Sequence, residues 1–240
     1  MSQMYSILRN GAQQFNLTLT DAQLAAFEQY SQELIAWNQR VNLTSITAPD
    51  EIAVKHFLDS LSLYPLLAEL PPTLALIDVG TGAGFPGLPL KLALPQLRLT
   101  LLESTGKKTA FLQHLIQVLH LTGVAILTAR AEEAGRRPDQ RERYDVATAR
   151  AVAALPVLAE YTLPFVKQGG LVIVQKGQHP ADELKAAANA LGILGGKVSQ
   201  ILPVTVPGLD AERHLVVIQK IKPTPPQYPR RPGLPAKKPI

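Results

Sequence analysis

The segment Ile77-Asp78-Val79-Gly80-Thr81-Gly82-Ala83-Gly84-Phe85-Pro86-Gly87 decides the fold class of this 240-residue chain. The apolar run 74–79 predicts a buried strand, and the closely spaced glycines that follow it precede an apolar helix that extends to about Leu94. Glycines at such a turn permit positive φ and let a ligand approach the backbone closely. The segment therefore predicts a strand, a ligand-binding turn and a helix, and the usual ligand of such a turn is a nucleotide.

Two kinds of cofactor are candidates for this turn. Residues 82–87 match the dinucleotide fingerprint G-x-G-x-x-G, but Gly80 is the first glycine after the strand, so the match begins two residues late. Asp78 at the strand end would repel a pyrophosphate, and it would attract the sulfonium and amino groups of S-adenosylmethionine. The pattern Asp78-x-Gly80-x-Gly82-x-Gly84 therefore favours S-adenosylmethionine. The alternative is a tight turn that binds no ligand.

A second acidic residue ends the next apolar run. Glu103 lies 23 residues after Gly80, where a carboxylate can accept hydrogen bonds from both ribose hydroxyls. Either cofactor needs this interaction. Glu103 therefore supports nucleoside binding without distinguishing between the two.

Short apolar runs alternate with helical patterns in most of the remaining chain. The predicted strands are 74–79, 98–103, 124–128, 145–148, 171–175, 201–206 and 214–220. Such alternation predicts a mostly parallel sheet with helices on both faces. The last two runs are joined by residues 207–213, which are too few for a crossover helix, so the last strand should be antiparallel. The expected fold class is α/β, a Rossmann-like S-adenosylmethionine-dependent methyltransferase fold with a seven-stranded sheet.

Three regions are expected along the chain: a helical N-terminal extension (1–72), a methyltransferase domain (73–222) and a basic, proline-rich tail (223–240). Thr20 and Asp21 can cap a first amphipathic helix. A second amphipathic stretch should begin at Pro49 and end before Pro65. The tail contains seven of the 20 prolines and should be extended rather than folded.

The composition excludes several classes of protein. The formal net charge is +5, but six basic residues and no acidic one lie in residues 220–240, so the preceding chain is close to neutral. The absence of cysteine rules out disulfides, thiolate-bound zinc and a cysteine nucleophile, and no metal is expected. No run is apolar enough for a signal peptide or a membrane helix, so we expect a cytoplasmic, monomeric protein without a membrane partner.

The sequence also limits the methyl acceptor. Methylation at pyrimidine C5 needs a cysteine adduct, which this chain cannot form. No N-P-P-Y or D-P-P-Y tetrapeptide follows the fourth strand, which argues against an exocyclic amine. Guanine N7 carries a free lone pair and needs no general base, so catalysis there rests on proximity and alignment. This explains the missing motifs but does not demonstrate a substrate.

Several segments together resemble the small-subunit (16S) ribosomal RNA guanine-N7 methyltransferase G family, also called glucose-inhibited division protein B. They are residues 41–44, 55–61, 78–87, 131–132, 149–151 and 228–233, and the resemblance extends over nearly the whole chain. It implies methyl transfer to guanine N7 at position 527 of 16S rRNA, in naked RNA or in the small ribosomal subunit. It also implies cofactor contacts at Gly80, Phe85, Glu103, Ser104, Thr105, Ala131, Glu132 and Arg150. The residues after Glu103 depart from the family pattern, so the contacts at Ser104 and Thr105 are less firmly implied.

The remaining candidate residues would contact RNA. Asn42, His56, Asp59 and Ser60 are hypothesised to form the acceptor pocket at the cofactor mouth, although a solvated helix face is the alternative. Lys176, Tyr228, Arg230 and Arg231 are the RNA-binding candidates, through phosphate neutralisation and base stacking. A solubilising tail would be the simpler interpretation of the last three. If the tail binds RNA, truncation after Ile221 should weaken RNA binding and flatten its dependence on salt. A methyltransferase for a small molecule or a protein, and an RNA-binding assembly factor with a vestigial cofactor site, remain the alternative functions.

Overall fold

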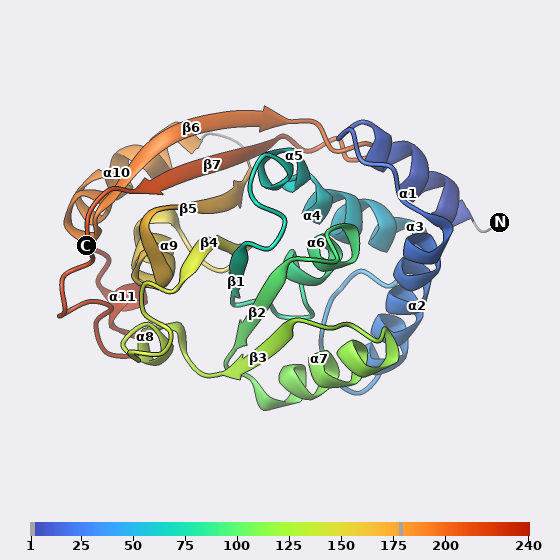
Figure 1. The fold of residues 1–240 in the computed structure, drawn as a ribbon, viewed down its shortest axis with the longest axis horizontal. Coiled ribbons are helices and arrows are strands. Elements are labelled where there is room, and N and C mark those ends of the chain that lie inside the picture. The colour runs from blue at the N-terminus through green and yellow to red at the C-terminus, as the bar shows by residue number, and fades with distance from the viewer. Residues whose placement is uncertain (1–2, 178–179) are drawn as a thin grey trace.

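Seven strands form one mixed sheet with helices on both sides (Figure 1). The computed structural model describes residues 3–177 and 180–240. The strands are β1 (Ala75–Val79), β2 (Arg98–Glu103), β3 (Val124–Thr128), β4 (Tyr144–Ala149), β5 (Val166–Lys176), β6 (Gly196–Val204) and β7 (Arg213–Lys220). They lie in the order β3-β2-β1-β4-β5-β7-β6. Strand β7 is antiparallel to both β5 and β6, and the other neighbouring pairs are parallel. The predicted α/β fold with an antiparallel last strand is confirmed.

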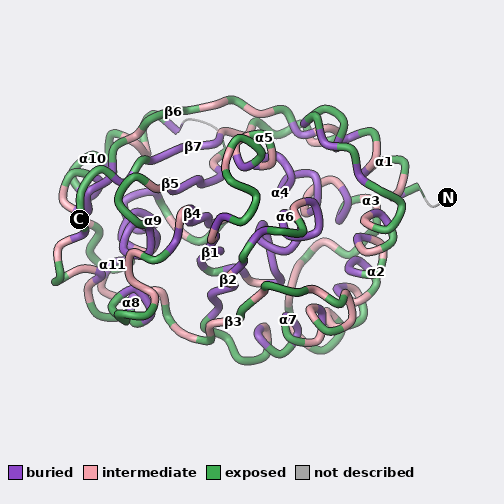
Figure 2. Tube along the Cα trace, viewed as in Figure 1, coloured by how far each residue is buried: buried purple, intermediate pink, exposed green. Residues whose placement is uncertain are grey.

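Helices cover both faces because neighbouring residues of each strand point to opposite sides. The helices are α1 (Gln3–Gln13), α2 (Asp21–Asn38), α3 (Pro49–Ile52), η1 (Ala53–Leu58), α4 (Asp59–Leu61), α5 (Tyr64–Ala68), α6 (Gly87–Ala93), α7 (Gly106–Val118), α8 (Ala131–Ala134), α9 (Leu155–Thr162), η2 (Leu163–Phe165), α10 (Pro180–Leu194) and α11 (Leu234–Lys237). On β1, Leu76 packs in a core with α1, α2, α6 and α7, whereas Ile77 packs in a second core with α9 and α10. Buried segments accordingly run through the middle of the molecule (Figure 2).

The N-terminal helices begin and end largely where the sequence predicts. The Thr20 hydroxyl accepts a hydrogen bond from the Gln23 amide, and the Gln23 side chain accepts one from the Thr20 amide, which caps α2. The second stretch begins at Pro49 and ends at Leu61, but it contains the π-helix η1, which the sequence pattern does not reveal. Pro65 lies in the first turn of α5, where its missing N–H is tolerated.

The C-terminal tail is folded, so the prediction of an extended tail is wrong. Thr224, Pro229 and Pro235 are buried, and the tail contains the short helix α11. Arg136 and Arg141 donate to tail carbonyls, including Pro229 O at 2.6 Å and Tyr228 O at 2.7 Å. Because these side chains satisfy the backbone acceptors, a segment rich in proline can pack without regular secondary structure.

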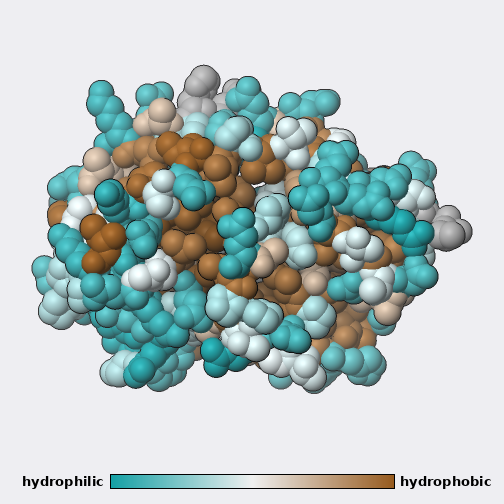
Figure 3. All heavy atoms as spheres, turned by 45° about the horizontal axis from the view of Figure 1, so that its top comes forward, coloured by the Kyte–Doolittle hydropathy of each residue, from teal (hydrophilic) through white to brown (hydrophobic). Residues whose placement is uncertain are grey.

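The surface carries both apolar and polar side chains. In the space-filling view, apolar patches alternate with polar side chains over the visible face (Figure 3). In the part of the chain that the structure describes, the large hydrophobic side chains that are clearly exposed are Val152, Ile201 and Ile221. No helix among those residues combines the length and apolar character needed to span a membrane.

Candidate functional site

The glycine turn after β1 has the backbone conformation that its sequence predicts. Gly80, Gly82 and Gly84 have φ values of 70°, 61° and 102°. A Cβ atom at Gly84 would lie 2.5 Å from Leu88 and 2.6 Å from the Tyr30 hydroxyl, so this position also lacks room for a side chain. A Cβ atom at Gly82 would meet nothing within 4 Å. The turn is therefore packed tightly on one side at Gly84 and is open at Gly82.

Asp78 lies beneath this turn rather than in an open cavity. Its Oδ2 atom accepts hydrogen bonds from the Thr81 hydroxyl at 2.6 Å and from the Gly87 amide at 2.8 Å. The side chain is completely buried, and this burial raises its pKa to about 6. Oδ2 thus fixes both ends of the turn, whereas the buried Oδ1 atom has no hydrogen-bond partner among the described residues, and the role of Asp78 in cofactor binding stays a prediction.

A cavity lies beside the turn, at the carboxyl ends of β1, β2 and β3. It is lined by Val79, Gly80, Leu102, Glu103, Ser104, Ala129, Arg130, Ala131, Glu132, Val152 and Tyr161. Glu103 Oε2 accepts a hydrogen bond from the Gly82 amide at 3.1 Å, and Oε1 accepts one from the Thr105 amide at 2.8 Å. The structure therefore brings together Gly80, Glu103, Ser104, Ala131 and Glu132, five of the residues that the sequence assigns to the cofactor.

The cavity has a volume of about 100 Å³, and its polar groups suit the nucleoside part of S-adenosylmethionine. Each Glu103 oxygen accepts one hydrogen bond from the backbone and retains a lone pair for a ribose hydroxyl. Glu132 is buried, and its Oε1 atom accepts from the Gly233 amide at 2.9 Å. Burial together with the neighbouring Glu132 carboxylate raises the pKa of the Tyr161 hydroxyl. The Val152 side chain packs against Gly80: a Cβ atom added at Gly80 would lie only 2.9 Å from it. This contact narrows the cavity.

Phe85 does not line this cavity but belongs to a stack of rings beside it. The Tyr30 and Phe85 rings are nearly parallel with centroids 5.4 Å apart, and the His56 ring stacks on Phe85 at 4.5 Å. The Arg150 guanidinium lies 4.9 Å from the centre of the Phe85 ring. The Tyr30 hydroxyl donates to Ala83 O at 2.6 Å, so the stack is anchored to the glycine turn.

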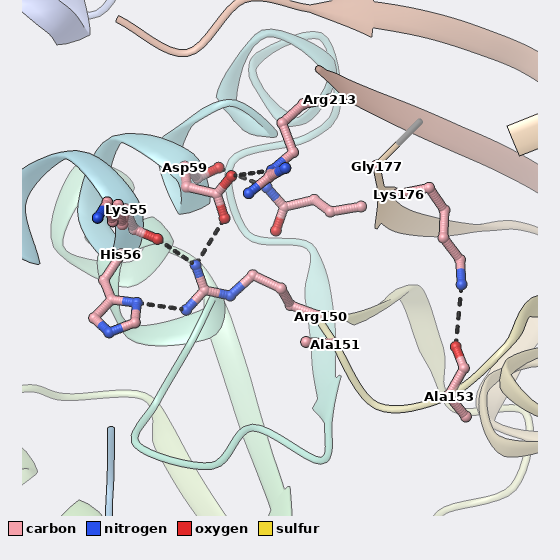
Figure 4. Close-up of a pocket in the computed structure, with 10 residues that line it drawn as sticks. Lys55, His56, Asp59, Arg150, Ala151, Ala153, Lys176, Gly177 and Arg213 are labelled. Carbon is pink, nitrogen blue, oxygen red and sulfur yellow. Dashed lines mark hydrogen bonds and ion pairs between the residues drawn. The ribbon is translucent and has the colours of Figure 1, made fainter. Parts of the chain in front are cut away.

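A second cavity of about 410 Å³ lies next to the first, since Val152 lines the first cavity and its neighbours Ala151 and Ala153 line the second. It is lined by Lys55, His56, Asp59, Arg150, Ala151, Ala153, Gln175, Lys176, Gly177 and Arg213 (Figure 4). Asp59 is 2% exposed and lies between two arginines. Its Oδ2 atom accepts from Arg150 at 2.7 Å, and its Oδ1 atom accepts from Arg213 at 3.0 Å. Four basic residues line this cavity, and three carboxylates pair with them: Asp59 with both arginines, Glu51 with Lys55 and Glu183 with Lys176. The remaining excess of one positive charge favours an anionic substrate.

His56 is neutral in this environment. The Arg150 guanidinium donates to its Nδ1 atom at 3.2 Å, so the ring proton lies on Nε2, which is 2.8 Å from the Thr44 hydroxyl oxygen. Burial, and then the charge of Arg150, lowers the pKa of His56 to about 4. A flat, uncharged ring therefore faces the second cavity.

Some of the predicted cofactor-binding and acceptor-pocket residues do not line the cavity to which the sequence assigns them. Ser60 is buried, its hydroxyl donates to His56 O at 2.6 Å, and it lines neither cavity. Asn42 is exposed and does not line either cavity. Arg150 lines the second cavity instead of the cofactor cavity, because Asp59 holds its side chain there. Lys176 does line the second cavity, and its ammonium donates to Ala153 O at 3.0 Å.

The tail residues have different positions. Arg230 forms an ion pair with Glu160, whose side chain is 1% exposed, and so its guanidinium is already engaged by a carboxylate. Arg231 is exposed, and Tyr228 is partly buried in the core that contains α9.

Sequence reasoning missed Arg213, Gln175 and Thr44. No local signal marks Arg213, since its partner Asp59 lies 154 residues earlier in the chain. Among residues 3–177 and 180–240, no group of three or more histidines and carboxylates could hold a metal ion.

Comparison with known proteins identifies the family. A family model described as rRNA small subunit methyltransferase G matches residues 23–216. A relative from Roseiflexus sp. (strain RS-1), named ribosomal RNA small subunit methyltransferase G, is 52% identical over 98% of this chain and 99% of its own length. A relative of the same name from Acetivibrio thermocellus is 48% identical over 98% of this chain and 96% of its own length.

Solved structures show the same fold at low sequence identity. A mutant form of MtNAS has a TM-score of 0.55 and 15% identity, over 84% of this chain and 76% of that one. TrmN from Thermus thermophilus has a TM-score of 0.52 and 19% identity, over 70% of this chain and 53% of that one. The match of the family model, together with relatives near 50% identity over almost the full length, shows that the chain belongs to the rRNA small subunit methyltransferase G family.

Proposed function

We propose that this protein transfers a methyl group from S-adenosylmethionine to N7 of a guanine in 16S rRNA, at position 527 as the resemblance implies. Its relatives carry the name ribosomal RNA small subunit methyltransferase G. The observation that carries the proposal is the pair of cavities that meet at residues 151–153, one lined by Glu103 and Glu132 and the other by four basic residues.

The first cavity would hold the cofactor. Glu103 would accept the ribose hydroxyls, the turn at Gly80 and Gly82 would lie against the cofactor, and Ala131 and Glu132 would hold the adenine edge. Ser104 and Thr105 complete the strand end. Bound S-adenosylmethionine supplies an electrophilic methyl group. The Asp78 carboxylate contributes by holding the turn.

The second cavity would hold the acceptor. Guanine N7 would accept the methyl group through its free lone pair, and no proton has to leave N7, so the site needs no general base. Neutral His56 offers a flat surface to the base without adding positive charge next to a purine that becomes cationic. Asp59 holds Arg150 and Arg213 in position, and Lys55 and Lys176 lie at the same cavity for RNA phosphates. The protein would act in the cytoplasm, where its rRNA substrate is found.

The test is transfer of labelled methyl to naked 16S rRNA, to small ribosomal subunits and to a panel of small metabolites, followed by mapping of the modified base. Label at guanine N7 in either RNA form supports the proposal and identifies the preferred substrate. Label only in metabolites favours the small-molecule alternative, and RNA binding without transfer favours an assembly factor. Methylation unchanged in folded His56→Ala and Asp59→Ala variants would refute the acceptor pocket.

A further inference from the structure

The folded tail packs against α8 and α9, two helices whose residues line the cofactor cavity. Helix α8 contributes Glu132 to that cavity, and helix α9 contributes Tyr161. Helix α8 contains only four residues, too few to be stable through its own hydrogen bonds. The position of the Glu132 side chain must therefore depend on contacts from elsewhere in the chain.

The tail supplies one of these contacts to each helix. The Gly233 amide donates to Glu132 Oε1 at 2.9 Å. Three residues earlier, Arg230 forms a two-point ion pair with Glu160 on α9, with Nη2 to Oε2 at 2.7 Å and Nε to Oε1 at 3.0 Å. Its backbone amide also donates to Glu160 Oε1 at 2.7 Å. Because Glu160 is 1% exposed, this pair is protected from solvent and fixes the tail firmly to α9.

The polypeptide after α8 holds the other side of the tail. Arg136 donates to Pro229 O at 2.6 Å and to Gln227 O at 3.0 Å. Arg141 donates to Thr224 O and to Tyr228 O, both at 2.7 Å. These four bonds tie the tail to the segment that follows α8, so α8, α9 and the tail form one connected unit behind the cavity.

We propose that the C-terminal tail positions Glu132 for cofactor binding by joining α8 to α9 through the Gly233–Glu132 hydrogen bond and the Arg230–Glu160 ion pair. The tail holds one Glu132 oxygen from behind, and the same carboxylate neighbours the Tyr161 hydroxyl at the cavity. The tail is then a part of the S-adenosylmethionine site rather than a free arm for RNA. The inference rests on the proposed assignment of this cavity to the cofactor.

The test measures binding of S-adenosylhomocysteine by calorimetry, without RNA, to the full-length protein. Arg230→Gln should weaken this binding at least fivefold, raise KM for the cofactor and leave kcat at saturating cofactor nearly unchanged. Arg230→Lys should recover part of the affinity because it retains a cation beside Glu160. Arg137→Gln is the matched control, since it makes the same substitution near α8 in an ion pair whose partners are about half exposed.

Three further measurements also test the role of the tail. If Arg230→Gln does not fold, Gly233→Ala decides: the residue has φ +79° with open space around its Cβ, so the substitution strains the backbone that carries the amide without a side-chain clash. Weaker binding of S-adenosylhomocysteine in this variant supports the proposal, and unchanged binding overturns it. The proposal is also overturned if Arg230→Gln binds S-adenosylhomocysteine like the control. A loss of RNA affinity in Lys237→Ala/Lys238→Ala and Arg230→Gln, without loss of cofactor affinity, would make the tail an RNA arm instead.

A separate variant tests the assignment of the cavity. If Glu103→Gln leaves binding of S-adenosylhomocysteine unchanged, the cofactor binds elsewhere and the proposed site fails. If Glu103→Gln abolishes binding and Arg230→Gln does not weaken it, only the role of the tail fails.

Discussion

Replacement of Asp59 by asparagine tests whether the two arginines of the second cavity are held by a buried carboxylate. Asp59 is 2% exposed, and it accepts hydrogen bonds from Arg150 at 2.7 Å and from Arg213 at 3.0 Å. Removing one partner of a buried ion pair costs about 3–5 kcal/mol. The two arginine side chains are 15% and 28% exposed, so water offsets part of this cost.

The expected destabilisation by Asp59→Asn is about 2–3 kcal/mol, because asparagine retains one acceptor and solvent reaches both guanidinium groups. In a protein of this size about 1 kcal/mol corresponds to roughly 2–4 °C in Tm, so Tm should fall by about 4–12 °C. Thermal and urea unfolding without ligand measure the change. The control is Asp139→Asn, whose partner Arg137 is equally charged but lies at the surface, and which should cause no resolvable shift.

The result that would refute this reasoning is a Tm for Asp59→Asn that matches the Asp139→Asn control. The arginines would then be held by other contacts, such as the Lys55 carbonyl that accepts from Arg150 at 3.1 Å. In the folded variant, affinity for S-adenosylhomocysteine should be nearly unchanged, since Asp59 does not line the cofactor cavity. Methyl transfer to RNA should fall at least tenfold, because the acceptor would no longer be aligned.

Three further outcomes are expected. Glu103→Gln replaces one acceptor oxygen by a donor and should weaken binding of S-adenosylhomocysteine by about 10–100-fold, as calorimetry would show, whereas the exposed control Glu133→Gln should not. Because burial lowers the pKa of His56 to about 4, the unfolded chain takes up a proton near pH 6.5 that the folded chain resists. The contribution of His56 to stability is therefore complete above pH 6.5 and is lost as the pH falls to 4, so the stability of wild type minus that of His56→Gln should drop by up to about 3 kcal/mol in urea titrations across this range. Gly84→Ala should destabilise by more than about 2 kcal/mol, because it combines positive φ with contacts below 3 Å, whereas Gly82→Ala should cost only the backbone strain of about 1–2 kcal/mol; equal unfolding midpoints would contradict this difference.

Much of the cofactor site could be predicted because its residues follow strand ends directly. Gly80 and Glu103 come at the carboxyl ends of β1 and β2, which are neighbouring parallel strands, so register alone brings them to one edge of the sheet. The position of Asp78 in the chain does not reveal that its side chain is buried. One carboxylate oxygen holds the turn through Thr81 and Gly87, and only the packing around Asp78 decides this.

The number of basic residues in 220–240 does not show which of them are available to bind RNA. Lys220 is fully buried, where it donates to Leu163 O and contacts Glu142, and Arg230 pairs with Glu160. Two of the six basic residues in 220–240 are thus structural, Lys220 at the end of β7 and Arg230 in the tail. The sequence composition gives the number of charges but not which of them have a buried partner. The basic residues of this segment therefore suggest a free RNA-binding arm, although two of them already have partners.

The sequence by itself determined the seven strands, the glycine turn and the acid at the second strand end, because backbone conformation follows from local spacing. The bounds of two strands differ from the prediction, since β5 begins at Val166 and β6 at Gly196, each five residues before the predicted start. Only the tertiary structure decided which distant charges meet. It brought Arg213 to Asp59 and Gly233 to Glu132. These pairs are separated by 154 and 101 residues, and no local preference encodes such contacts. They form because the packing of whole elements leaves a buried carboxylate that needs a donor.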